Sequence, residues 1–139
     1  MNWIRSILAV GLGFGVFVIG SFMPRSAVTQ NPAEPPTIGL ITGSIAYGVV
    51  FAALGGLTAA SLPGRKPLAH GLVVAGLIAA AAIIHPLLEP GLNPRWLDLS
   101  AVLVMAPAAA LAAWARSKLP PGPGHPSGQE AAAPAVRRG

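Results

Sequence analysis

The chain has 139 residues, of which 53% are hydrophobic and only 9% are charged, and its mean hydropathy is +0.65. A soluble globular domain carries about 25% charged residues, so these few charges exclude a water-covered surface and favour lipid as the solvent. The absence of cysteine excludes disulfides, thiolate metal sites and cysteine nucleophiles. The net charge of +5 would suggest nucleic acid in a soluble protein, but the basic residues lie at expected helix ends and in the tail, where topology signals and lipid headgroup contacts explain them.

The first apolar run, Ile7–Met23, follows a short basic start and predicts a membrane helix over about 3–23. A basic start and an apolar core also fit a secretory signal peptide, with small residues at 26–28 as its cleavage site. The run of about 17 residues exceeds the roughly 7–15 residues of a usual signal core, and further spans follow, which favours a retained helix. Gly11 and Gly15 form a Gly-x-x-x-Gly pair, suited to close helix packing in lipid.

A polar, proline-rich connector is expected over Pro24–Thr37, with Thr37 as the N-cap of the next helix. Ile38–Ser61 carries no charge and would extend roughly 36 Å as a helix, enough to cross a bilayer core of about 30 Å. Small residues recur every fourth position along it and predict a face on which neighbouring backbones approach closely. They are Ser44, Gly48, Ala52, Gly56 and Ala60, with Gly39 and Gly43 as a second pair at the same spacing.

The turn after this helix contains Pro63 and Gly64, which end it, and Pro67 fits the first position of the next helix. So short a turn requires that the helices over 38–61 and 68–88 be antiparallel neighbours.

Proline also marks the boundaries of the last predicted helix. Pro86 is expected to weaken the last turn of the helix over 68–88. Asn93 and Pro94 fit the N-cap and the first position of a helix over 94–115. Pro107 lies inside that last helix and predicts a kink. From 117 to 139 the chain is rich in proline and glycine with little apolar bulk, which predicts a disordered tail.

The positive-inside rule orients this arrangement. With four spans, five near-membrane Lys and Arg residues lie on the side of both termini and only Arg25 and Arg95 lie on the other, which predicts cytoplasmic termini. We expect the basic residues of the cytoplasmic side, with a nearby histidine, to contact lipid headgroups. These residues are Arg5, Arg65, Lys66, His70, Arg116 and Lys118. The three tryptophans, at positions 3, 96 and 114, are expected in the aromatic belts at the two interfaces.

The middle of each run lacks Asp, Glu, Lys and Arg, which argues against a proton-coupled pump and excludes a voltage sensor. His85 lies about one turn from the outer end of its helix, and Glu89 follows at i+4, so the two could pair or shuttle a proton if the helix survives Pro86. An interfacial histidine bonded to headgroups or a loop carbonyl is the alternative. A metal site at His85 would need Glu89, Asp98 or Glu34 as further ligands, and we predict no metal site.

Tyr47 lies near the middle of the helix over 38–61, where its hydroxyl needs a partner. Together with Thr42, Ser44 and His85 it could line a polar path, although ordinary helix contact explains these residues as well. No Ser-His-Asp set is positioned by the sequence. We therefore expect no catalytic residue, no cofactor and no enzyme activity.

The segment Leu54–Leu72 resembles a pattern in small bacterial integral membrane proteins of four helices whose function is unassigned. In that pattern an alanine-rich helix with a Gly-Gly pair ends in a Gly-Arg turn, and a histidine opens the next helix. The matching positions are Gly55, Gly56, Gly64, Arg65, Pro67 and His70. The resemblance covers one hairpin and implies four spans.

These observations predict an all-α membrane protein with four transmembrane helices in an antiparallel bundle, in the bacterial inner membrane. The predicted function is a structural, accessory or assembly role in a membrane complex or homo-oligomer, with the lipid bilayer and other membrane subunits as partners. A passive channel or facilitator for a small solute is the alternative.

Overall fold

The structure, a computed structural model, describes residues 2–29, 35–62, 66–91 and 94–120. All regular secondary structure in these residues is helical, and its elements are α1 (Asn2–Thr29), α2 (Ile38–Ser61), α3 (Pro67–Leu88), α4 (Arg95–Ser100), the π-helical turn η1 (Ala101–Met105) and α5 (Ala106–Lys118). Within this described part, four stretches are long and apolar enough to cross a membrane: Trp3–Met23, Ile38–Ser61, Pro67–Leu88 and Arg95–Lys118. The chain is therefore an all-α, multi-pass membrane protein, as the sequence predicts.

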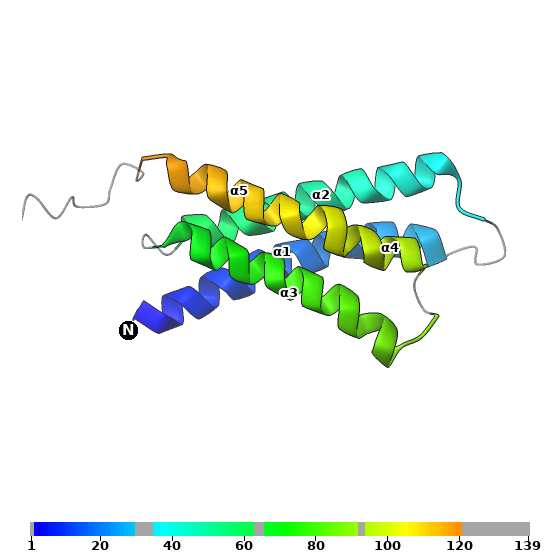
Figure 1. Cartoon of the computed structure of the whole chain (residues 1–139), viewed down its shortest axis with the longest axis horizontal. Helices are drawn as coiled ribbons and strands as arrows, with labels where there is room; N and C mark the ends of the chain where they lie inside the picture. The colour runs from blue at the N-terminus through cyan, green and yellow to red at the C-terminus, as the bar shows by residue number, and fades with distance from the viewer. Residues whose placement is uncertain (1, 30–34, 63–65, 92–93, 121–139) are drawn as a thin grey trace, which may run out of the picture.

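The four spans form an antiparallel bundle. α1 and α3 run from left to right in Figure 1, whereas α2 and the α4–η1–α5 span run back. α1 packs on α2 and α3, and α5 packs on the same two helices from the other side. We call the end that holds the start of α1 and the end of α5 the terminal end, and the opposite end the connector end. Towards the connector end, α3 diverges from the other helices (Figure 1).

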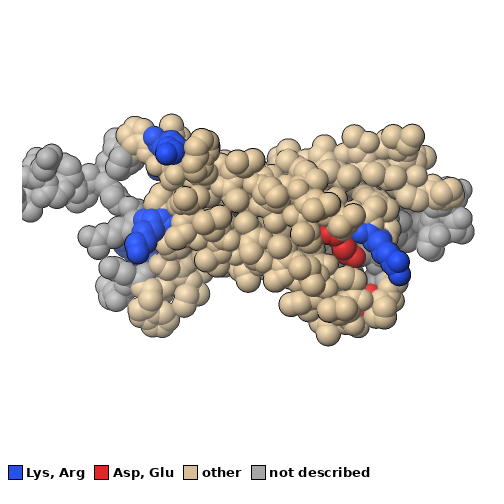
Figure 2. Space-filling model, viewed as in Figure 1, with Lys and Arg blue, Asp and Glu red and all other residues tan. Residues whose placement is uncertain are grey.

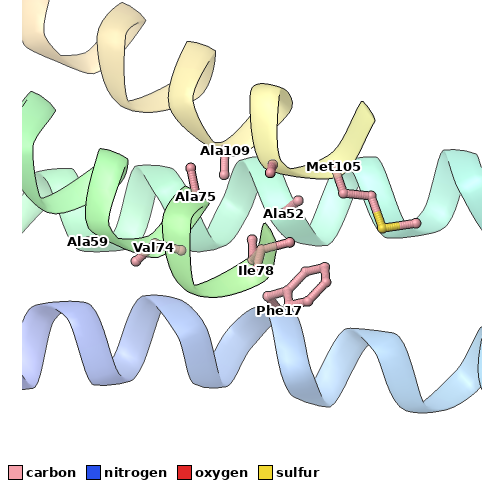
Figure 3. Close-up of a cluster of buried hydrophobic side chains, with 9 residues drawn as sticks. Phe17, Ala52, Ala59, Val74, Ala75, Ile78, Met105 and Ala109 are labelled. Carbon is pink, nitrogen blue, oxygen red and sulfur yellow. The ribbon is translucent and has the colours of Figure 1, made fainter. Parts of the chain in front are cut away.

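The core of the bundle is built from small side chains (Figure 3). Its largest fully buried side chains are Ile78 and Val74, and most of the others are alanines, such as Ala52 and Ala109. Large apolar side chains point outward instead, and Leu87 is 76% exposed. This distribution suits lipid, because lipid tails solvate leucine as well as a protein core does, while small core residues let the backbones touch.

The predicted small-residue face of α2 is confirmed, since Ser44, Gly48, Ala52, Gly56 and Ala60 are all buried. At the last glycine of this face, an added Cβ would overlap the backbone of Ala109 in α5, so the two helices are in backbone contact there.

The second set of glycines does not pack inside the bundle. A Cβ added at Gly11, Gly15, Gly39 or Gly43 would meet no atom within 4 Å. In α1 the contacts are made by Gly13 and Gly20 instead, and a Cβ at Gly13 would lie 2.5 Å from the carbonyl oxygen of Gly55. The reason is helical phase, because two residues turn the helix by roughly 200° and place Gly11 and Gly15 on the opposite side.

The first helix is longer than predicted. α1 continues through Pro24 to Thr29, so the polar connector is shorter than the expected Pro24–Thr37. A proline inside a transmembrane helix removes one hydrogen bond without ending the helix. Thr37 is the N-cap of α2 as predicted, and its hydroxyl accepts from the Leu40 N–H at 3.2 Å.

The start of α3 also follows the prediction. Pro67 is its first residue, and Lys66 before it has a left-handed φ of 54°. The helix passes through Pro86 and ends at Leu88. Pro63 and Gly64 lie outside the described residues.

The fourth span differs from the prediction at three points. Pro94 has extended backbone angles and stands at the N-cap rather than in the first turn, and the predicted cap, Asn93, lies outside the described residues. The disturbance expected at Pro107 takes the form of the η1 turn, in which the Ala106 N–H donates to the carbonyl of Ala101. α5 extends to Lys118, past the expected start of the tail, and residues 121–139 lie outside the described part.

Candidate functional site

A partly open cavity of about 160 Å³ lies where α1, α2, α3 and α4 meet, in the half of the bundle nearer the connector end. Its volume is close to that of an engineered protein cavity of about 150 Å³ that binds benzene. Most of its wall is apolar, with Phe17, Ile78 and Met105 as the largest buried side chains. Four polar residues also line it: Ser21, Ser44, His85 and Asp98.

Local structure explains why the helices leave space here. α3 diverges from the bundle on this side (Figure 1), and the facing positions carry the small residues Gly48, Ala82 and Ala101. The π-helical turn η1 begins at Ala101 and widens the helix where it borders the cavity. A diverging helix and small side chains together create a space that the core side chains do not fill.

Two hydroxyls line the cavity from α1 and α2. The Ser21 hydroxyl donates to the carbonyl of Phe17 at 2.8 Å, which leaves its oxygen lone pairs able to accept. Ser44 is 5% exposed and belongs to the small-residue face of α2. These hydroxyls supply acceptors on the α1 and α2 sides of a mostly apolar wall.

His85 and Glu89 pair as the i+4 spacing predicts. Helical hydrogen bonding continues past Pro86, because the Glu89 N–H donates to the carbonyl of His85 at 2.9 Å. The side chains approach to 3.8 Å between Nε2 and Oε2, and the Glu89 side chain is 60% exposed. The histidine thus links the cavity to a carboxylate at the end of α3.

Asp98 enters the cavity wall from the first turn of α4, where the amino-terminal end of a helix favours a negative charge. Among the described residues that line the cavity, none is lysine or arginine. Arg95, three residues earlier on the same helix, is exposed. Asp98 therefore contributes a negative charge to this wall.

From the sequence, Asp98 was considered as a metal ligand and as part of a Ser-His-Asp set, and neither role was predicted. The described residues contain no group of three His, Cys, Asp or Glu side chains that could hold a metal ion, and Glu34 lies outside them. Ser21 and Phe17 were missed altogether, because only the packing of α1 brings them beside Asp98 and His85.

Tyr47, which the sequence analysis placed on a possible polar path, lies away from the cavity. Its ring packs against Phe51 with centroids 4.7 Å apart, and it borders a separate shallow groove with Gly39 and Gly43. Thr42 donates to the carbonyl of Ile38 at 2.8 Å and does not line the cavity. Of the four residues expected to line a polar path, the cavity therefore holds two.

Charged side chains lie near the two ends of the bundle on the face that Figure 2 shows, with an uncharged band between them. The terminal end carries the helix-end basic residues Arg5, Lys66, Arg116 and Lys118, while Arg65 lies outside the described residues. The His70 Nδ1 lies 3.0 Å from the Lys66 carbonyl, so this ring is positioned beside the turn. This placement fits the expected headgroup contacts.

The tryptophans divide into two groups. Trp3 and Trp114 are largely exposed at the terminal end, as an aromatic belt requires, and the Lys118 Nζ lies 5.5 Å from the Trp114 ring centroid. Trp96 differs, because its indole N–H is buried and no described residue accepts its hydrogen bond.

Comparison of the chain with protein-family models, with curated proteins and with solved structures finds no match. The resemblance of Leu54–Leu72 to small bacterial four-helix membrane proteins stays a prediction. Function is therefore argued from geometry.

Proposed function

We propose that the protein is a non-catalytic accessory or structural component of the membrane, which assembles with another membrane subunit or with further copies of itself. The observation that carries the proposal is the open space at four glycines, Gly11 with Gly15 on α1 and Gly39 with Gly43 on α2. Each pair has the spacing at which two transmembrane helices bring their backbones into contact. The bundle uses other glycines for its own packing, so these two pairs remain for a partner helix.

The surroundings of the glycines support this role. Gly11 borders a groove between α1 and α3 with Ile7, Val10 and Val73 on its walls. A glycine flanked by large apolar side chains accepts the ridge of a neighbouring helix, and van der Waals contact then replaces contact with lipid tails.

Retention of α1 belongs to this proposal. Gly13 and Gly20 contact α2, and Phe17 is part of the buried core. Cleavage of α1 as a signal peptide would uncover Phe51 and Gly55 of α2, on the side that these contacts cover.

We also propose the bacterial inner membrane as the location, with both termini in the cytoplasm. The basic residues at the terminal end support this orientation, because the connector end has only Arg25 and Arg95, together with the acidic Glu89 and Asp98. The positive-inside rule places the more basic side in the cytoplasm.

The assembly proposal is tested by crosslinking in native membranes, followed by native mass spectrometry of the purified full chain. We expect a reproducible larger species, reduced at least about tenfold by leucine at both Gly11 and Gly15 or at both Gly39 and Gly43, since a bulky side chain separates the helices by more than contact distance. Gly76→Leu is the matched control, because Gly76 is also open but belongs to no such pair. A strictly monomeric chain, or an assembly that both double variants leave intact, refutes the proposal.

A passive facilitator is the second candidate, and the presence of Ser44 and His85 in the cavity favours it. The space ends at Ile78, and beyond it the fully buried Val74 fills the centre of the bundle. A pocket closed on one side is better suited to holding a molecule than to passing one. Liposome flux that disappears in His85→Ala and persists in Tyr47→Phe would favour transport nevertheless, because only the first of these residues lines the cavity.

A further inference from the structure

We propose that the cavity near the connector end binds a small organic cation, in which an ammonium group is attached to a compact apolar body. Asp98 supplies the charge, Ser21 and Ser44 supply hydrogen-bond acceptors, and Phe17 supplies an aromatic face. The inference concerns a different surface from the glycine pairs and does not depend on the assembly proposal.

The carboxylate of Asp98 in the lining favours a cation. Asp98 is the fixed charge among the described lining residues, and Glu89 adds a second carboxylate 3.8 Å from the imidazole of His85. The nearest arginine on α4, Arg95, is exposed rather than part of the wall. In a site bounded by apolar side chains, a carboxylate attracts a cation more strongly than it would in water, and it repels an anion.

The hydrogen-bonding groups match an ammonium. An alkylammonium has three N–H donors and no acceptor, so it needs acceptors around it. A carboxylate offers about four lone-pair positions, so Asp98 can accept from a ligand in addition to its contacts within the protein. The Ser21 hydroxyl gives its proton to the Phe17 carbonyl at 2.8 Å and keeps its oxygen as an acceptor.

The inner part of the cavity selects an apolar body. Ile78 and Met105 are almost completely buried and close the cavity on the side of the bundle centre. The Phe17 ring adds a face that can contact either an aromatic ring or the cation itself. The volume of about 160 Å³ sets the scale at one aromatic ring or a short alkyl chain.

The depth of the cavity orients the ligand. Along α3 its lining extends from Ile78 to His85, which corresponds to roughly 10 Å of helix. His85 and Asp98 lie towards the connector end, whereas Ile78 lies towards the bundle centre. The ammonium therefore lies near Asp98 and the apolar body points inward.

The probe for this site is 4-fluorobenzylamine, added to the full chain in lipid nanodiscs and followed by ¹⁹F NMR, with empty nanodiscs measured in parallel. We expect saturable binding of this cation, and weaker binding of 4-fluorobenzoate, which has the same ring and the opposite charge. Asp98→Asn should weaken binding of the amine by about 10- to 100-fold, the range for a hydrogen bond to a charged group, and should leave the neutral 4-fluorobenzyl alcohol within about twofold.

Three further variants keep the test independent of that single carboxylate. Ala82→Leu fills the cavity and should weaken the amine and the alcohol alike, whereas Ile83→Leu, at a side chain that is 55% exposed on the outer surface, should change neither. Arg95→Gln removes the nearest cation on α4 and should tighten amine binding. The proposal is overturned if Asp98→Asn binds the amine as tightly as the parent, if benzoate binds as tightly as the amine, or if Ala82→Leu has no effect.

Discussion

Gly56 is the position at which the packing of this bundle can be tested most directly. A Cβ at Gly56 would overlap the Ala109 carbonyl oxygen and would lie 2.8 and 2.9 Å from its carbonyl carbon and Cα. Ordinary contact begins near 3.4 Å, so the carbonyl carbon alone requires a separation of roughly 0.6 Å between α2 and α5, and the closer carbonyl oxygen requires more. Because all three atoms belong to the backbone, no side-chain rotation can relieve the overlap.

The cost of Gly56→Ala follows from these contacts. Overpacking costs about 1–3 kcal/mol, and a backbone that cannot yield places this site at the upper end, near 3 kcal/mol. The better helix propensity of alanine offsets up to about 1 kcal/mol of this cost, so we expect the free energy of unfolding to fall by about 2 kcal/mol. Gly43→Ala in the same helix has open space around its Cβ and should be neutral or more stable by up to about 1 kcal/mol.

The measurement is reversible unfolding by SDS in mixed micelles at concentrations where the chain is monomeric, followed by tryptophan fluorescence. The two variants should differ by about 2–3 kcal/mol, which is roughly 30- to 150-fold in the unfolding equilibrium. If Gly56→Ala proves as stable as Gly43→Ala, the backbone contact between α2 and α5 does not hold the bundle together, and the reasoning from small core residues fails.

Three further outcomes are expected. Gly48→Ala should cost about 1 kcal/mol, less than the same change at the α5 contact, because its Cβ meets the flexible end of Met105; equal losses in the SDS titration would contradict this. Ile78→Ala should cost about 2 kcal/mol, near the lower limit for buried residues because lipid removes the water-transfer part, while Leu87→Ala should change stability by less than about 0.5 kcal/mol. A similar loss in both variants would contradict the assignment of Ile78 to the core and of Leu87 to the lipid-facing surface. A reporter fused after Gly139 should be active in the cytoplasm, and a periplasmic signal would reverse the proposed orientation.

Element boundaries were predictable where one residue decides them. Thr37 and Pro67 start α2 and α3 as expected, since a hydroxyl N-cap and a proline in the first turn are local chemistry. Pro24 and Pro107 were harder to interpret, because lipid tolerates helices that lose a hydrogen bond, and the chain continues through one site and forms a π-helical turn next to the other.

The sequence allowed only part of the candidate site to be predicted. The His85–Glu89 pair follows from i+4 spacing on one helix and could be predicted. Its association with Asp98 and Ser21 could not, because these residues come from α4 and α1 and meet only through the crossing of helices. The Gly-x-x-x-Gly motif was ambiguous in the same way, since the spacing says that a face can be close-packed but not whether the partner is within the chain.

The all-α class, the four spans and their antiparallel order follow from hydropathy, length and turn residues, because in lipid every backbone group must be satisfied within its own helix. Which glycines contact a neighbour, where the cavity opens and which polar groups share it depend on helix rotation and crossing. Those quantities arise from contacts between distant segments, such as Gly13 with Gly55, and no local pattern in the sequence encodes them.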